Sequence, residues 1–125
     1  MLAGDFYIIN SFQNQDNNVS VMLELDAAHE IFGGHFPQQP VVPGVCMMQI
    51  IKEITEQAVD YPLNLVRADE MKFLAIIDPL KNTTIKAELK YTEDDSGKVF
   101  VTASLLKDEL VHFKFKGSFT QLSPL

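Results

Sequence analysis

The pattern of hydrophobic and polar positions predicts two short strands near the N-terminus. Residues 5–15 ("DFYIINSFQNQ") and 18–26 ("NVSVMLELD") are both rich in residues that favour strands. The Asn-rich stretch at residues 14–18 lies between them and is typical of a turn. We therefore expect a pair of strands joined by a turn.

Residues 45–60 ("VCMMQIIKEITEQAVD") predict the main helix, which should end near "DYP". At about 100° per residue, the apolar positions fall on one side of this helix. The members of this side are Met47, Ile50, Ile51, Ile54 and Ala58. The members of the opposite, polar stripe are Gln49, Lys52, Glu53, Glu56 and Asp60. The pattern thus predicts an amphipathic helix with one face in the core.

The rest of the chain predicts four more strands. Their ranges are 64–77, 83–93, 98–108 and 109–122, separated by "DPLKN", "EDDSGK" and the region around Asp108. In the last strand Phe113, Phe115 and Phe119 should face one way. His112, Lys114 and Lys116 should face the other. Two strands, one helix and four strands indicate an α+β arrangement, with an antiparallel sheet and a helix on one face.

Length and composition favour a single domain over residues 1–125. The chain is 46% hydrophobic and 22% charged, which is ordinary for a soluble globular protein. No apolar run approaches the roughly 18 residues of a membrane span. The first residues, "MLAGDFYIINSF", lack the basic start of a signal peptide. We expect a cytoplasmic protein.

Charge and cysteine content argue against several classes of site. Cys46 is the one cysteine, so an internal disulfide is excluded, and with only three His a structural zinc site is not expected. The formal net charge is −7, whereas nucleic-acid binding needs a basic surface.

The candidate chemistry lies in residues 33–44, "GGHFPQQPVVPG", which hold one His, three Pro and three Gly. Each proline removes a backbone donor, so a fixed loop is predicted. Gly44 would precede or begin the helix, where backbone N–H groups have no intrahelical partner and the helix dipole is positive. Such an end can hold the oxygen of a polarised thioester carbonyl, at a distance from His35 that the prolines set. The alternative is a plain capping loop in which His35 packs against Phe36.

This stretch resembles a known signature. "FGGHFPQQPVVPGV" is similar to the pattern G-H-F-P-G-x-P-x-x-P-G-V of the 3-hydroxyacyl-[acyl carrier protein] dehydratases of fatty-acid synthesis. "MKFLAIIDPL" is similar to that family's K-F-x-x-x-V-x-P-G-D, although the Gly-Asp is absent. The resemblance implies a hotdog fold, in which an antiparallel sheet wraps around one long central helix. It also implies a homodimer, which could assemble further, with active sites at the interface.

The resemblance also implies roles for particular residues. His35 takes the position of the catalytic base and Gly44 that of the oxyanion donor. Gln49 stands where the family has a helix carboxylate, and an amide neither gives up nor takes a proton near neutral pH. Gln49 can then only orient a hydroxyl or a water. Substrate contacts are predicted for Phe36, Pro43, Val45, Cys46 and Met48.

Other titratable residues have simpler interpretations. Glu53 lies about 6 Å beyond Gln49 by helical rise, too far to replace the missing carboxylate. We expect His29 to have a local role beside the site, Cys46 to be a small buried residue, and His112 to be solvated.

Three functions follow. The first is a dehydratase that converts 3-hydroxyacyl thioesters into trans-2-enoyl thioesters in fatty-acid or related synthesis, with no metal or organic cofactor. The second is a catalytically weak or silent acyl-binding partner subunit, and the third is an acyl thioesterase. An acyl carrier protein is acidic and would need a basic patch, for which Arg67, Lys72, Lys52 and Lys90 are candidates. Coenzyme A is the alternative carrier.

Overall fold

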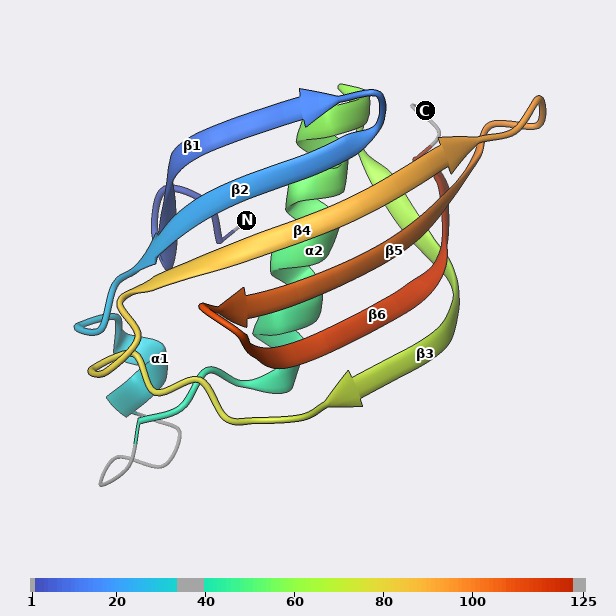
Figure 1. Cartoon of the computed structure of the whole chain (residues 1–125). Coiled ribbons are helices and arrows are strands. Elements are labelled where there is room, and N and C mark those ends of the chain that lie inside the picture. Colours follow the sequence, from blue (N-terminus) through green and yellow to red (C-terminus); the bar gives the residue numbers. More distant parts are fainter. Residues whose placement is uncertain (1, 34–39, 123–125) are drawn as a thin grey trace.

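The structure is a computed structural model that describes residues 2–33 and 40–122 (Figure 1). The strands and helices are β1 (Tyr7–Gln15), β2 (Asn18–Leu25), α1 (Glu30–Gly33), α2 (Gly44–Val59), β3 (Leu63–Phe73), β4 (Thr84–Glu93), β5 (Lys98–Lys107) and β6 (Leu110–Gln121). Each predicted strand and the predicted main helix are present. Within the described residues, no helix is long and apolar enough to cross a membrane.

The strands form one six-stranded antiparallel sheet in the order β1-β2-β4-β5-β6-β3. The sheet curls around α2, which crosses its concave side (Figure 1). This arrangement confirms the predicted α+β class and the hotdog fold. It leaves β1 and β3 as the two edge strands of the described sheet.

The first hairpin follows from its turn residues. Gln15 pairs with Asn18, so only Asp16 and Asn17 form the loop, and their φ values are 53° and 64°. Two-residue hairpin loops favour positive φ at both positions, and Asn and Asp adopt that conformation more readily than most residues. The turn predicted from the Asn-rich stretch is confirmed.

Helix α2 begins and ends within one residue of the range 45–60 that its sequence predicts. The Pro43 carbonyl accepts hydrogen bonds from the N–H groups of Cys46 and Met47 in the first turn. At the other end Asp60 adopts a left-handed conformation with φ 67°, and its N–H donates to the Glu56 carbonyl at 2.8 Å. Met47, Ile50, Ile51 and Ile54 of its apolar face are buried, and Ala58 is partly buried against the core. Phe113, Phe115 and Phe119 of β6 are buried too, as predicted.

Strand β3 is shorter than predicted and ends at Phe73. The N–H groups of Leu74 and Ala75 both donate to the carbonyl of His112, so the chain leaves the regular ladder there. The segment then turns toward α2, where the Val42 N–H donates to the Ile77 carbonyl at 2.9 Å. This turn places residues 73–76 beside the start of the helix.

The prediction that His112 is solvated is wrong, because its side chain is only 1% exposed. Leu105 pairs with Phe113 and Leu106 with Val111, so His112 is an extra residue in a β-bulge. A bulge interrupts the alternation of side chains along a strand. The ring Nδ1 lies 3.4 Å from the Ala75 carbonyl oxygen, and Nε2 has no partner among the described residues.

Glu53 also departs from its predicted environment. The helical pattern places it on the polar stripe, yet the side chain is only 6% exposed. The segment before β1 covers this part of α2 and hydrogen-bonds to the carboxylate. The polar stripe of α2 is therefore partly buried inside the protein.

Candidate functional site

A pocket of about 470 Å³ opens at the N-terminus of α2. Two segments form it: the turn into the helix and the chain that follows β3. The lining residues are Val41, Val42, Pro43, Gly44, Met47, Phe73, Leu74, Ala75 and Ile76. The side chains are almost all apolar, and the volume falls within the range of small-molecule sites. The pocket can therefore hold part of an aliphatic acyl chain.

Gly44 is the first residue of α2 and lies at this pocket. Its backbone N–H has no hydrogen-bond acceptor among the described residues, as expected for the first turn of a helix. A Cβ atom at this position would lie 2.9 Å from Cε1 of Phe73. Glycine thus lets the Phe73 ring lie close against the helix start, next to an N–H group on the positive end of the helix dipole.

Gln49 lies one turn and a half further along α2. Its Nε2 donates a hydrogen bond to Oε2 of Glu53 at 2.8 Å. The side chain is partly buried, so the amide is held by this contact rather than left free in solvent. Gln49, which stands where the similar family has a helix carboxylate, is therefore held in place by the carboxylate of Glu53 one turn later.

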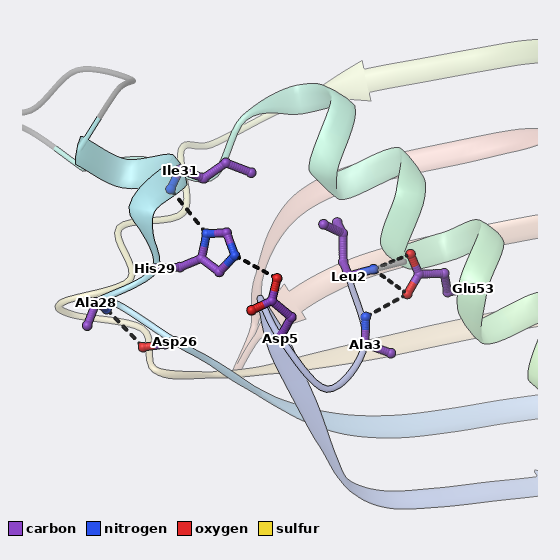
Figure 2. Close-up of polar contacts among 8 residues, drawn as sticks. All are labelled: Leu2, Ala3, Asp5, Asp26, Ala28, His29, Ile31 and Glu53. Atoms are coloured by element: carbon purple, nitrogen blue, oxygen red, sulfur yellow. Dashed lines mark hydrogen bonds and ion pairs between the residues drawn. The ribbon is translucent and has the colours of Figure 1, made fainter.

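The Glu53 carboxylate accepts further hydrogen bonds from the start of the chain (Figure 2). The Leu2 N–H donates to Oε1 and Oε2 at 3.1 and 2.8 Å, and the Ala3 N–H donates to Oε1 at 2.8 Å. The Tyr7 hydroxyl donates to Oε1 at 3.2 Å. Burial, followed by the charge of Glu53, raises the pKa of Tyr7 far above its usual range, so this hydroxyl keeps its proton.

The other predicted site residues have varied surroundings. Pro43 lines the pocket. Val45 is 76% exposed and Met48 is half-buried. Cys46 is buried, as predicted, and burial raises the pKa of its thiol, which makes it a packing residue rather than a reactive thiolate. His35 and Phe36 lie outside the described residues.

His29 has the local role that the sequence predicts (Figure 2). The Ile31 N–H donates to its Nδ1 at 3.1 Å, so the ring proton sits on Nε2, which lies 3.0 Å from Oδ2 of Asp5. The ring also packs edge-on against Phe6. His29 thus ties the beginning of α1 to the segment before β1.

The pocket residues at the end of β3 and directly after it were not identified from the sequence. Phe73, Leu74 and Ile76 are all exposed, although they are large and apolar. The signal that could have found them is the second similarity, "MKFLAIIDPL", which contains an apolar run ("FLAII", residues 73–77) that continues past the end of β3 at Phe73.

Comparison with a family model decides the relationship. The model of the ApeI-like family, the ApeI dehydratases, matches residues 11–116. This range contains α2, the pocket and the segment after β3. The chain belongs to the ApeI-like dehydratase family. Membership indicates a dehydratase activity in general. A separate comparison with curated proteins found no match.

Solved structures share the fold of this family member. The dehydratase heterocomplex ApeI:P from Xenorhabdus doucetiae superposes with a TM-score of 0.67 at 19% identity, covering 91% of this chain and 97% of that one. A phenylacetic acid degradation-related protein from Ralstonia eutropha gives 0.62 at 10% identity, covering 90% and 83%. A sigma28-regulated virulence protein from Campylobacter jejuni gives 0.68 at 9% identity, covering 91% and 84%. At such identities these similarities support the fold alone.

Proposed function

We propose that the protein dehydrates 3-hydroxyacyl thioesters to trans-2-enoyl thioesters. The observation that carries the proposal is the glycine start of α2, with an N–H free of acceptors among the described residues, at an apolar pocket of about 470 Å³. The acyl chain lies along the pocket and the thioester oxygen accepts a hydrogen bond from the Gly44 N–H. Negative charge builds on that oxygen as C2 is deprotonated, and a donor in a water-poor site stabilises it.

The proton transfers are assigned to His35. Its neutral imidazole removes the C2 proton, and the electron pair of that bond forms the C2–C3 double bond. The C3–O bond breaks, and the imidazolium returns its proton to the departing oxygen, which leaves as water. Gln49 accepts a hydrogen bond from the 3-hydroxyl but supplies no proton, so the imidazole alone exchanges protons in this scheme.

We propose a homodimer in which His35 of one protomer faces Gln49 of the other. The exposed apolar residues of β3 and the segment after it support this arrangement. The carrier is an acyl carrier protein or coenzyme A. Among the candidate cations for docking an acidic carrier, Arg67 pairs with Asp69 and Lys72 pairs with Glu70, which leaves less free positive charge on β3.

A second candidate function is a catalytically silent subunit. Gln49 has no proton to exchange, and one fold neighbour is a dehydratase heterocomplex. In such a pair, a different subunit would supply the carboxylate.

The deciding experiment incubates the purified protein with 3-hydroxybutyryl and crotonyl thioesters and follows their interconversion. We expect turnover by the wild type and none by His35→Ala. An undiminished rate in His35→Ala would contradict the mechanism, and a wild type without turnover would favour the silent subunit. Release of free thiol, measured in parallel, would indicate a thioesterase instead.

The variant Gln49→Glu tests the role of the amide. We expect it to raise the dehydration rate, because a general acid–base group contributes roughly 10²- to 10⁴-fold. The carboxyl group of the variant would occupy the place of the amide and, unlike the amide, could give a proton to the departing oxygen. A rate that stays the same or falls in a folded Gln49→Glu variant would argue against this position being at the reacting hydroxyl.

A further inference from the structure

The proposed mechanism gives no task to Glu53, although this buried carboxylate is extensively hydrogen-bonded. Both oxygens are used: Oε1 accepts from Leu2, Ala3 and Tyr7, and Oε2 accepts from Leu2 and Gln49. A carboxylate in this condition is poorly suited to exchange protons with a substrate. Its arrangement instead suits a fixed acceptor that orients its neighbours.

We propose that Glu53 is a positioning residue that locks the Gln49 amide with Oε1 as its free acceptor, and that the segment Leu2–Tyr7 holds Glu53 for this purpose. The inference rests on the proposed function, since it assigns the orientation of a residue at that site. It also makes the site depend on the segment Leu2–Tyr7, which belongs neither to the Pro-Gly motif nor to the pocket lining.

The orientation of the amide follows from donor and acceptor chemistry. An ionised carboxylate only accepts hydrogen bonds, and Nε2 is the donor of the Gln49 side chain. A flipped amide would bring its Oε1 to the place that Nε2 now occupies, 2.8 Å from Oε2 of Glu53, where two acceptors repel. Oε1 is therefore kept on the side away from Glu53, so the amide meets a ligand as an acceptor.

The carboxylate is itself held in place by a compact turn. The Gly4 N–H donates to the Tyr7 carbonyl at 2.7 Å and the Phe6 N–H donates to the Leu2 carbonyl at 2.8 Å. Phe6 and Tyr7 are fully buried, so the turn is anchored in the core, and the N–H groups of Leu2 and Ala3 point at Glu53 on α2 (Figure 2). Glu53 cannot change rotamer without breaking several of the hydrogen bonds that its carboxylate accepts.

The consequence concerns which ligand the site accepts. An amide locked as an acceptor binds a group that donates, such as the 3-hydroxyl of a 3-hydroxyacyl thioester or a water. A freely rotating amide would bind donors and acceptors alike. Glu53 thus favours the hydroxyl substrate in one orientation.

A double-mutant cycle tests whether Glu53 acts through Gln49. Glu53→Gln is made in the wild type and in Gln49→Ala, and kcat, KM and the unfolding temperature are measured for all four proteins. We expect Glu53→Gln to lower kcat about tenfold or more in the wild type and less than about twofold in Gln49→Ala. Equal losses of kcat in both backgrounds would overturn the proposal, because a general structural role affects both alike.

Matched variants keep this test interpretable. Glu56→Gln is the control, because Glu56 lies on the same helix but accepts from the Leu63 N–H at 2.8 Å and not from Gln49. Its kcat should stay within about twofold of the wild type. If Glu53→Gln does not fold, Tyr7→Phe takes its place in the cycle, since it removes one donor to Glu53 and keeps the ring. Its smaller loss of kcat should likewise disappear in Gln49→Ala.

A second readout does not depend on activity. In a ¹⁵N NMR spectrum, the Nε2 protons of Gln49, assigned from their loss in Gln49→Ala, should show one hydrogen-bonded and slowly exchanging proton. Glu53→Gln should shift this signal and speed its exchange, and an unaffected signal would overturn the proposal. If this signal behaves as expected while the wild type has no dehydratase activity, the lock stands and the proposed function fails.

Discussion

At the residue scale, Gly44 combines three properties that the proposed chemistry needs. It starts α2, its N–H has no acceptor among the described residues, and it has no Cβ atom to collide with the Phe73 ring at the pocket. The sequence located this residue through the Pro-Gly pattern. The contribution of Phe73 depends on the path of the chain after β3 and had no signal in that pattern.

Gly44→Ala should separate activity from stability. The added methyl group would lie 2.9 Å from Cε1 of Phe73, at the tip of a half-exposed ring that can rotate away. We expect the free energy of unfolding to change by less than about 1 kcal/mol, because Ala is a better helix former than Gly. The methyl would crowd the thioester oxygen, and kcat/KM should fall by about 10²-fold. Chemical denaturation and steady-state kinetics check the two effects, and normal kcat/KM would contradict the oxyanion role.

Two residue-scale predictions from the sequence, for Glu53 and His112, were wrong for related reasons. Helical periodicity correctly places Glu53 beside Gln49, but the covering segment comes from 46 to 51 residues earlier in the chain. Strand alternation places His112 with Lys114, but the bulge at His112 breaks that alternation. Neither the covering segment nor the bulge has a local sequence signal.

At the element scale, the pairing of β3 with β6 is the least regular part of the sheet. Register shifts occur between Leu65 and Arg67 and between Ala68 and Glu70. These shifts bring the backbone of β3 unusually close to Gly117 of β6. A Cβ atom there would lie 2.2 Å from the Arg67 carbonyl oxygen and 2.6 Å from Cζ of Phe115.

Gly117→Ala should therefore destabilise the protein. The nearest atom belongs to the backbone, so the two strands must separate to admit the methyl group. We expect the free energy of unfolding to fall by about 2–3 kcal/mol in chemical denaturation, as for overpacking of a well-filled interior. Gly33→Ala is the control, because a Cβ there meets no atom within 4 Å. Equal stabilities of the two variants would show that β3 can shift freely.

At the scale of the whole molecule, exposed apolar side chains gather along β3 and the segment after it. They are Leu65, Val66, Met71, Phe73, Leu74 and Ile76. An edge strand with this composition is prone to pair with another chain, and exposed apolar side chains that gather in one region mark an interface. The surface adjoins the pocket through Phe73, Leu74 and Ile76, which supports a dimer whose sites lie at its interface.

The double variant Leu65→Lys/Val66→Lys tests this interface. In a symmetric dimer each change is repeated on both subunits, so four ammonium groups would be brought together. We expect analytical ultracentrifugation to show a dimer for the wild type and a monomer for the variant, with loss of dehydration. Phe100→Lys is the control. Phe100 is about as exposed as Leu65 (45% and 44%), but it lies on β5, which is not an edge strand because it pairs with both β4 and β6. A fully active wild-type monomer would contradict the dimer.

The sequence by itself determined the six strands and the main helix, their order along the chain and the position of Gly44 at the start of that helix. Periodicity and turn residues act within a few positions of one another, so Asp16–Asn17, the α2 boundaries and the Phe113–Phe119 face were all predictable. The Pro-Gly motif also indicated a hotdog dehydratase, which the match to the ApeI-like dehydratase family over residues 11–116 supports, whereas the more specific 3-hydroxyacyl-[acyl carrier protein] dehydratase family stays a prediction.

Only the tertiary structure decided what covers each face. It brought the chain after β3 over Gly44 to form the pocket, and it brought Leu2 and Ala3 onto Glu53. A local pattern tells which side of its own element a residue occupies, but the partner on that side comes from a distant part of the chain. The burial of Glu53, and with it the fixed orientation of Gln49, follows from the folding of the N-terminal turn onto the middle of α2.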